Sequence, residues 1–382
     1  MANRFMCETL GTACVGLSMA LAAPAAFAVP DILETDARPT LLAPESLLND
    51  ATRAGERIVA VGERGHVIFS DDEGRTWVQG SVPVALTLNA VDFGSDQHGW
   101  VVGHSGSVLH SSDGGESWTL QLDGIQASEL AMASKEEQIA EMEEQIEQAP
   151  DDEKADLEWA LDDLYFTLEN MQADLDVGPV NPFLDVWFED TSHGFVVGAY
   201  GMILRTQDGG ESWQDWAPNL DNPQSFHINS ITQVTGGALV AVGEAGQIHV
   251  SVDGGDTWER RESPYTGSLF GAMGTGQINE VLVFGLRGNT FRSTDLGRSW
   301  IVVPNDGGAT LNNGAVADDG RITLVGNNGA VLMSTNGGES FSVHFRNDRE
   351  SIMAVVPLSG TNLMLVGEGG VKFSDAHGRN PN

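Results

Sequence analysis

The stretch that decides the fold is residues 197–213, which read Val-Gly-Ala-Tyr-Gly-Met-Ile-Leu-Arg-Thr-Gln-Asp-Gly-Gly-Glu-Ser-Trp. It begins with a Val-Gly-x-x-Gly turn and ends with a Ser/Thr-x-Asp-x-Gly-x-x-Trp turn, or Asp box. The first turn recurs seven times (once as Phe-Gly), at spacings of 41, 95, 45, 42, 41 and 41 residues. Its first glycines are Gly62, Gly103, Gly198, Gly243, Gly285, Gly326 and Gly367. A repeat of this length is typical of a β-propeller blade.

Each repeat contains four short segments in which apolar or β-branched residues alternate with polar ones. In the second repeat these segments are 88–94, 99–103, 107–111 and 117–122. The chain has 46 glycines among 382 residues, which suits the many tight turns between short strands. We therefore predict an all-β fold, a seven-bladed propeller that forms one domain over residues 29–382.

The seventh repeat stops after its third strand, because the chain ends soon after Ser374. A spare extended stretch, residues 31–42, precedes the first repeat. We predict that this stretch pairs as the missing outer strand of the seventh blade. The ring would then be closed by backbone hydrogen bonds, and no sheet edge would stay exposed there.

The long interval between the second and third repeats indicates an insertion at residues 123–176. Its second half places apolar residues at alternating steps of four and three, which predicts an antiparallel helical hairpin with a coiled-coil seam. These apolar residues are Leu157, Leu161, Leu164, Leu168, Met171 and Leu175. The insertion contains 18 acidic residues and 2 lysines, a charge of −16. Two interpretations stay open: a solvated projection, or an arm that binds a basic or amphipathic surface of another protein.

Residues 1–28 have the pattern of a secretory signal peptide. Arg4 provides the positive end, an apolar run follows at 11–23, and Ala26-Phe27-Ala28 forms a cleavage site. The cysteines, Cys7 and Cys14, both lie in this segment, and the context of Cys14 does not suggest a lipid anchor. We expect a soluble product that is exported to the periplasm, or to the thylakoid lumen in a photosynthetic source, without disulfides.

The formal net charge of −36 restricts the partners. Phosphate groups repel such a surface, so nucleic acid is excluded as an electrostatic partner and an anionic membrane is disfavoured. The acidity could equally reflect a saline habitat.

The Asp boxes are predicted to be structural. An aspartate in a glycine-rich turn accepts hydrogen bonds from nearby backbone N–H groups, and the tryptophan packs between adjacent sheets. The residues concerned are Asp72, Trp77, Asp113, Trp118, Asp208, Trp213, Asp253, Trp258, Asp295 and Trp300. His98 and His193 recur at equivalent positions of neighbouring blades, but no third ligand stands at a fixed spacing. We therefore predict no catalytic residue, no metal and no cofactor.

The Val-Gly-x-x-Gly turns are the predicted binding surface. They join the second and third strands, so they share one face of the disc with the blade-to-blade connections and with the hairpin. We call this the top face. The residues between the glycines differ from blade to blade, and loops on a rigid scaffold are common binding sites. The candidate partner-binding residues are Arg64, His104, Tyr200, Glu244, Arg287, Asn327 and Asn328.

The blade sequence resembles the repeat of the photosystem II stability/assembly factor family. The resemblance rests on residues 197–213 and on 91–103, and it covers roughly residues 45–378 apart from the hairpin. It implies a seven-bladed, exported, non-enzymatic protein that holds a membrane-protein complex during assembly. Photosynthetic members have an arginine-rich patch, whereas the 16 arginines here are scattered and only Arg260 and Arg261 are adjacent. We therefore expect a branch from non-photosynthetic bacteria, which serves an export or transport system.

Asp-box repeats also resemble those of sialidases and other glycosidases, so a carbohydrate-active propeller, hydrolase or lectin, is the alternative. It requires a deep top-face cleft with paired carboxylates and stacked aromatic rings. An interaction scaffold requires a broad top face with exposed apolar groups beside the hairpin.

Overall fold

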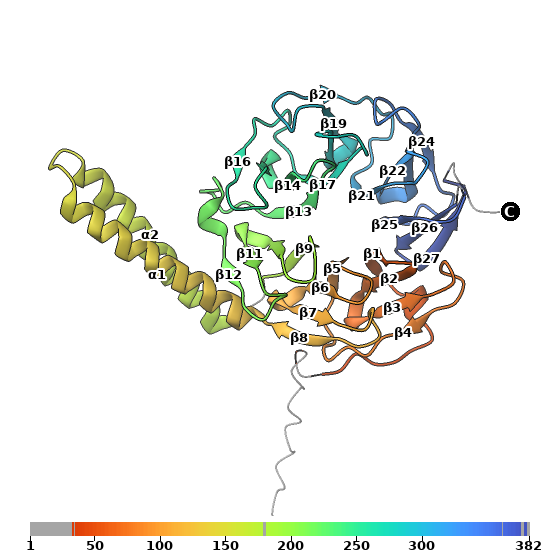
Figure 1. The fold of residues 1–382 in the computed structure, drawn as a ribbon, viewed down its shortest axis with the longest axis horizontal. Coiled ribbons are helices and arrows are strands. Elements are labelled where there is room, and N and C mark those ends of the chain that lie inside the picture. Colours follow the sequence, from red (N-terminus) through yellow and green to blue (C-terminus); the bar gives the residue numbers. More distant parts are fainter. Residues whose placement is uncertain (1–32, 34, 179–180, 361, 376–377, 380–382) are drawn as a thin grey trace, which may run out of the picture. The chain divides into compact units, whose positions relative to one another are not determined.

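The computed structural model describes residues 33, 35–178, 181–360, 362–375 and 378–379. Seven antiparallel sheets follow one another around a ring, and two helices are inserted between the second and third sheets (Figure 1). The predicted seven-bladed propeller with a helical hairpin is thereby confirmed. The predicted signal peptide, residues 1–28, lies outside the described residues.

Among the described residues, six blades have four strands and the seventh has three. Blade one contains β1 (Leu48–Ala54), β2 (Arg57–Gly62), β3 (Val67–Ser70) and β4 (Val78–Gln79), and blade two contains β5 (Leu88–Phe93), β6 (Gly99–Gly103), β7 (Val108–Ser111) and β8 (Thr119–Leu122). Blade three contains β9 (Phe183–Phe188), β10 (Gly194–Gly198), β11 (Ile203–Thr206) and β12 (Gln214–Asp215), blade four contains β13 (Ile228–Gln233), β14 (Leu239–Gly243), β15 (Ile248–Ser251) and β16 (Glu259–Arg260), and blade five contains β17 (Leu269–Gly274), β18 (Val281–Gly285), β19 (Thr290–Ser293) and β20 (Ile301–Val302). Blade six contains β21 (Leu311–Val316), β22 (Ile322–Gly326), β23 (Ala330–Ser334) and β24 (Ser342–Phe345), and blade seven contains β25 (Ile352–Pro357), β26 (Leu363–Gly367) and β27 (Gly370–Ser374).

The core lies between successive blades. The second strands, such as β10 with the sequence Gly-Phe-Val-Val-Gly, are buried along their length, apart from the half-buried Arg57 that begins β2, because they face a neighbouring sheet on both sides. At the interface between blades two and three, Trp100 stacks on Phe188 with ring centroids 3.5 Å apart. Trp213 meets the same phenylalanine edge-on at 6.2 Å. Burial of such side chains supplies the main stabilising free energy of the ring.

The first strand of every blade begins with a β-bulge. In β1 the pairing shifts between Leu48 and Asp50, and the same shift occurs at the start of β5, β9, β13, β17, β21 and β25. A bulge re-aims the side chains around it. The first residue of each inner strand, such as Leu48, stays buried between blades, whereas the residues that follow it, such as Asn49 and Asp50, line the centre of the ring.

The structure contradicts the prediction that residues 31–42 complete the seventh blade. Among the described residues of that stretch there is no strand, and the sheet of blade seven ends at β27. The stretch follows blade one instead: the Ala37 N–H donates to the Val82 carbonyl at 2.9 Å, and the Thr40 N–H donates to the side chain of Gln79 at 2.9 Å.

The ring is closed by side-chain packing between blades seven and one. Ala43, Leu48 and Ile58 from the N-terminal side form one apolar cluster with Met364 and Val366 from blade seven. A hydrogen bond of 2.8 Å from the Arg53 guanidinium to the Pro357 carbonyl joins the same two blades.

The insertion forms α1 (Gly124–Gln148) and α2 (Lys154–Val177), which run side by side (Figure 1). Asp123 and Gln126 make a reciprocal capping box that begins α1, with hydrogen bonds of 2.9 and 3.0 Å. Near the ring, Ala127 is buried in the apolar cluster of blades two and three, and α1 contacts β12. The hairpin is thus anchored to the propeller through α1.

Candidate functional site

The Val-Gly-x-x-Gly turns and the starts of the inner strands lie together on the top face. In each blade the N–H of the first variable turn residue donates to the carbonyl that precedes the inner strand, for example from His104 to Thr87 at 2.9 Å and from Glu244 to His227 at 2.9 Å. The α1 helix contacts the 104–106 turn. The hairpin and the turns therefore meet on the same face.

The second variable residue of six turns adopts a left-handed conformation. Its φ lies between 53° and 59° at Arg64, Ser105, Tyr200, Ala245, Arg287 and Asn328. Residues other than glycine adopt this region rarely and at a cost. This conformation lets the chain reverse direction between the second and third strands. The side chain of the left-handed residue can then face solvent, as that of Tyr200 does with 63 % exposure.

The structure brings together some of the candidate residues. The Tyr200 ring packs edge-on against His227 at 5.0 Å, and His227 lies 3.8 Å from the Glu244 carboxylate. Asn327 accepts a hydrogen bond of 3.0 Å from Asn312. Arg64, Arg287 and Asn328 are exposed on separate turns, and no contact among these three is recorded in the described structure.

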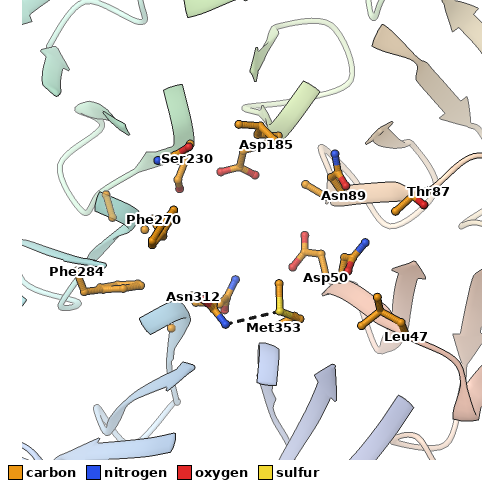
Figure 2. Close-up of a pocket in the computed structure, with 18 of the residues that line it drawn as sticks. Leu47, Asp50, Thr87, Asn89, Asp185, Ser230, Phe270, Phe284, Asn312 and Met353 are labelled. Atoms are coloured by element: carbon orange, nitrogen blue, oxygen red, sulfur yellow. Dashed lines mark hydrogen bonds between the residues drawn. The ribbon is translucent and has the colours of Figure 1, made fainter. Parts of the chain in front are cut away.

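His104 is the candidate residue that lines the central cavity of the top face. This cavity has a volume of about 520 Å³, and all seven blades contribute to its wall. Figure 2 shows polar side chains from the inner strands around it, with Phe270 and Phe284 on one side. A pocket of this size is in the range that holds a small ligand or a few peptide residues.

Asparagines at the bulge position of the inner strands line this cavity and also donate hydrogen bonds to the neighbouring blade. The side-chain amide of Asn49 donates to the Leu88 carbonyl at 2.8 Å, and that of Asn89 donates to the Phe183 carbonyl at 2.7 Å. Asn229 and Asn312 make the same bond to the first residue of the following inner strand, each at 2.8 Å. These amides therefore serve both the blade-to-blade contact and the polar lining of the cavity.

Two carboxylates, Asp50 and Asp185, point toward the cavity (Figure 2). Asp50 accepts a hydrogen bond of 2.9 Å from the Val91 N–H, and burial raises the pKa of Asp50 to about 6. Asp185 accepts one of 2.9 Å from the Ile231 N–H, and burial, followed by the charge of Asp50, raises the pKa of Asp185 to about 7. Each carboxylate thus ties its blade to the next, while the pair adds negative potential to the cavity when ionised.

Sequence reasoning missed this pair. With 55 acidic residues in the chain, no pattern singled out two of them. The signal that could have found them is positional: both stand two residues after the apolar residue that begins an inner strand, as Leu48 and Phe183 do.

In the Asp boxes, groups of the turn itself donate hydrogen bonds to the aspartate carboxylate. Asp72 accepts hydrogen bonds from the Ser70 hydroxyl at 2.8 Å and from the N–H and hydroxyl of Thr76 at 2.8 and 2.7 Å. These bonds lower the pKa of Asp72 to about 2, and equivalent bonds to Thr257 and Ser299 lower those of Asp253 and Asp295 to about 2. Asp113 and Asp208 repeat the pattern. Trp118 and Trp213 are buried, whereas Trp77, Trp258 and Trp300 are half-buried.

The histidines at the start of the second strands have separate partners. The Nδ1 of His98 lies 3.2 Å from the Nε2 of His110, and His193 contacts Asp190 at 3.1 Å. Within the described ranges, no three His, Cys, Asp or Glu side chains are grouped so that they could hold a metal ion. Neither described helix has the length and apolar composition that crossing a bilayer requires.

Relatives of this chain are photosystem II assembly proteins. The chain is 28 % identical over 202 residues to the photosystem II assembly lipoprotein Ycf48 of Synechococcus sp. (strain CC9902), which is 52 % of this chain and 60 % of that protein. It is 30 % identical over 146 residues to the chloroplastic photosystem II stability/assembly factor HCF136 of Oryza sativa subsp. japonica, or 35 % of this chain and 34 % of the relative. The chain thus spans less than two thirds of these relatives, and their names describe assembly factors rather than enzymes.

Solved structures show the same fold. YCF48 bound to a D1 peptide superposes with a TM-score of 0.57 at 17 % identity, covering 86 % of this chain and 92 % of that one. YCF48 from Cyanidioschyzon merolae gives a TM-score of 0.56 at 16 % identity, with 88 % and 97 % covered. The model of the family described as photosynthesis system II assembly factor YCF48 matches residues 73–141 and 167–381. With most of its length matched by that model, and with the seven-bladed ring described above, this chain belongs to the Ycf48 family of assembly factors.

Proposed function

We propose that this chain is an exported, non-enzymatic assembly factor that holds a segment of a membrane-protein complex against the top face of its propeller. The observation that carries the proposal is the cavity of about 520 Å³ at the centre of that face. Its wall comes from all seven inner strands, so it is as rigid as the ring itself. The exposed turns around it supply side chains that differ from blade to blade.

The relatives support this assignment. A YCF48 structure contains a D1 peptide, which shows that one propeller of this fold binds a peptide ligand. By analogy, the ligand here is a segment of a membrane protein that is exposed on the exported side. Arg64, His104, Tyr200, Glu244, Arg287, Asn327 and Asn328 are the residues that we assign to the contact.

We further propose a periplasmic location and a partner in an export or transport system. The support is compositional: the arginines do not gather into one patch, and the net charge is −36. A partner segment with basic residues would suit the Asp50 and Asp185 carboxylates at the cavity wall.

The experiment compares two pairs of exposed arginines. Arg64→Ala with Arg287→Ala removes both from the top-face turns, where Ala245 already adopts the same left-handed conformation. Arg75→Ala with Arg298→Ala removes two exposed arginines from Asp boxes, at the opposite ends of the strands. Purified variants are cross-linked to membranes of the source organism, and the captured partner is identified and quantified by mass spectrometry.

We expect the top-face pair to reduce the captured partner about tenfold and the Asp-box pair to leave it unchanged, because binding energy concentrates in few residues. Melting temperatures should stay within a few degrees for both. Equal capture by both pairs would refute the top-face assignment.

The carbohydrate-active alternative has one observation in its favour, the two carboxylates at the cavity. Their hydrogen bonds to the backbone of adjacent blades give them a structural role already. Hydrolysis of chromogenic glycosides that Asp185→Asn abolishes would favour the alternative.

A further inference from the structure

The hairpin has an unusually thin core. No residue of α2 is buried, and the buried apolar side chains of α1 are Ala127, against the ring, and Ile139. The seam residues of α2, such as Leu161 and Leu168, are only half-buried. Two helices cannot cover an apolar stripe from every side, so the hairpin exposes apolar surface that a third helix would cover.

A groove between the two helices lies where such a helix would pack. Its volume is about 870 Å³, and Met132 of α1 and Leu168 of α2 belong to its wall. Tyr165 and Phe166 also line it and are 45 % and 63 % exposed. Trp159, seven residues before Phe166 and so on the same side of α2, is 75 % exposed. Exposed aromatic side chains of this kind mark interaction surfaces.

The rest of the groove wall is acidic. Glu136, Asp162, Glu169 and Asp176 line it, and no lysine or arginine does. Within the hairpin, Lys135 lies near Asp163 and Asp215, and Lys154 lies 3.7 Å from Asp151. The four acids therefore face solvent without a basic partner in the groove wall.

We propose that this groove binds a basic amphipathic helix of a partner protein. The apolar side of that helix would pack on Met132, Tyr165, Phe166 and Leu168, and its lysines or arginines would pair with the four acids. Residues 162–176 of α2 span about 21 Å at 1.5 Å per residue, which corresponds to a bound helix of about four turns. The hairpin charge of −16 disfavours a second copy of the hairpin and an anionic membrane as occupants. This site is separate from the top-face cavity and does not depend on the function proposed there.

The test uses the full chain without its signal peptide and a synthetic helix as the probe. The probe has 16 residues, with leucines at helical spacing on one side and lysines on the other. One control peptide has the same composition in an order that has no apolar side, and the other has glutamate in place of lysine. Binding is measured by fluorescence anisotropy, and self-association by sedimentation velocity.

Two charge reversals serve as matched variants. Asp162→Lys with Glu169→Lys alters the groove, whereas Glu137→Lys with Glu144→Lys makes the same change of charge at exposed α1 residues outside it. Phe166→Ala tests the apolar contact without a change of charge. Circular dichroism establishes that the helices persist in each variant.

We expect saturable binding of the amphipathic probe with a stoichiometry of one, and binding about tenfold weaker for each control peptide. The groove reversal should weaken binding about tenfold and Phe166→Ala about fivefold, while the α1 reversal should change it less than about threefold. Equal losses in the two reversals would show non-specific attraction and overturn the proposal. Equal binding of the rearranged peptide would also overturn the proposal. The same holds if sedimentation velocity shows dimers of the protein that Phe166→Ala dissociates.

Discussion

At the scale of single residues, the inner strands use polar side chains where a propeller could have used apolar ones. Asn49 and Asn89 donate to the next blade, and Asp50, Asp92 and Asp185 accept from it. Burial raises the pKa of Asp92 to about 6, as it does for Asp50. The same side chains that line or underlie the candidate site therefore make the ring sensitive to pH.

Asp185 should make the protein more stable in mild acid. Its pKa of about 7 in the folded state exceeds the value of about 3.9 in an unfolded chain. The folded state therefore holds a proton that the unfolded state releases between about pH 4 and pH 7, and the free energy of unfolding falls as pH rises through this window. We expect Asp185→Asn to melt at a higher temperature than the parent at pH 8, and the difference to be smaller at pH 5 and to disappear only near pH 4.

The control has a pKa shift of opposite sign. Hydrogen bonds lower the pKa of Asp72 to about 2, so its contribution is lost only as pH falls below about 4. Asp72→Asn should therefore shift the melting temperature equally at pH 5 and pH 8. If the curves of Asp185→Asn and the parent ran parallel across this range, the assigned pKa would be wrong.

At the scale of elements, the Asp box joins the two outer strands of a blade and places its tryptophan between that blade and a neighbouring blade. Trp118 is 4 % exposed, donates from Nε1 to the Gly115 carbonyl at 3.1 Å and meets Phe93 edge-on. In blade six, Asn336 replaces the aspartate and keeps the bonds to Ser334 and Ser340. The turn thus needs an oxygen acceptor at this position more than it needs a charge, which favours a structural role.

Trp118→Ala should destabilise the protein by about 3–5 kcal/mol, because it removes a large buried side chain. Trp159→Ala, at an exposed hairpin position, should change stability by less than about 0.5 kcal/mol. Urea unfolding measures both, and capture of the partner at temperatures where the variants are folded should be unaffected by Trp118→Ala. An unchanged unfolding midpoint together with lost capture would replace the structural role by a functional one.

At the scale of the whole molecule, the described residues close the ring without a sheet that blades seven and one share. The apolar cluster of Leu48, Ile58 and Met364 joins the first and last blades, and residues 36–42 run along the edge of blade one. The outer edge of β27 is consequently not paired with residues 36–42, and closure depends on buried apolar contacts that form only when the ring is complete.

A chain that begins at Leu42 tests this closure. It loses the bonds of Ala37 and Thr40 to blade one and should be about 1–3 kcal/mol less stable than a chain that begins at Leu33. Hydrogen exchange should accelerate at residues 79–82 and stay unchanged along β27. Faster exchange in β27 instead would restore the closing strand that the sequence suggested.

The sequence by itself determined the number of blades, the strand order and the place of the hairpin. The Val-Gly-x-x-Gly turn and the Asp box depend on residues that are close together in the sequence. Glycines allow the backbone to turn. In the Asp box, the serine and the aspartate make hydrogen bonds to groups no more than four residues away. The sequence also placed the candidate turn residues on one face, because alternate turns of a meander lie at the same end of the sheet.

Only the tertiary structure decided the closure of the ring, the cavity and the hairpin groove. Asp50 and Asp185 stand 135 positions apart and meet at one cavity because bulges in two separate blades aim both side chains inward. Residues 36–40 form neither a helix nor a strand, and whether they lie against blade seven or blade one depends on which edge offers partners for Ala37 and Thr40. Such choices depend on contacts between distant parts of the chain, which no local pattern encodes.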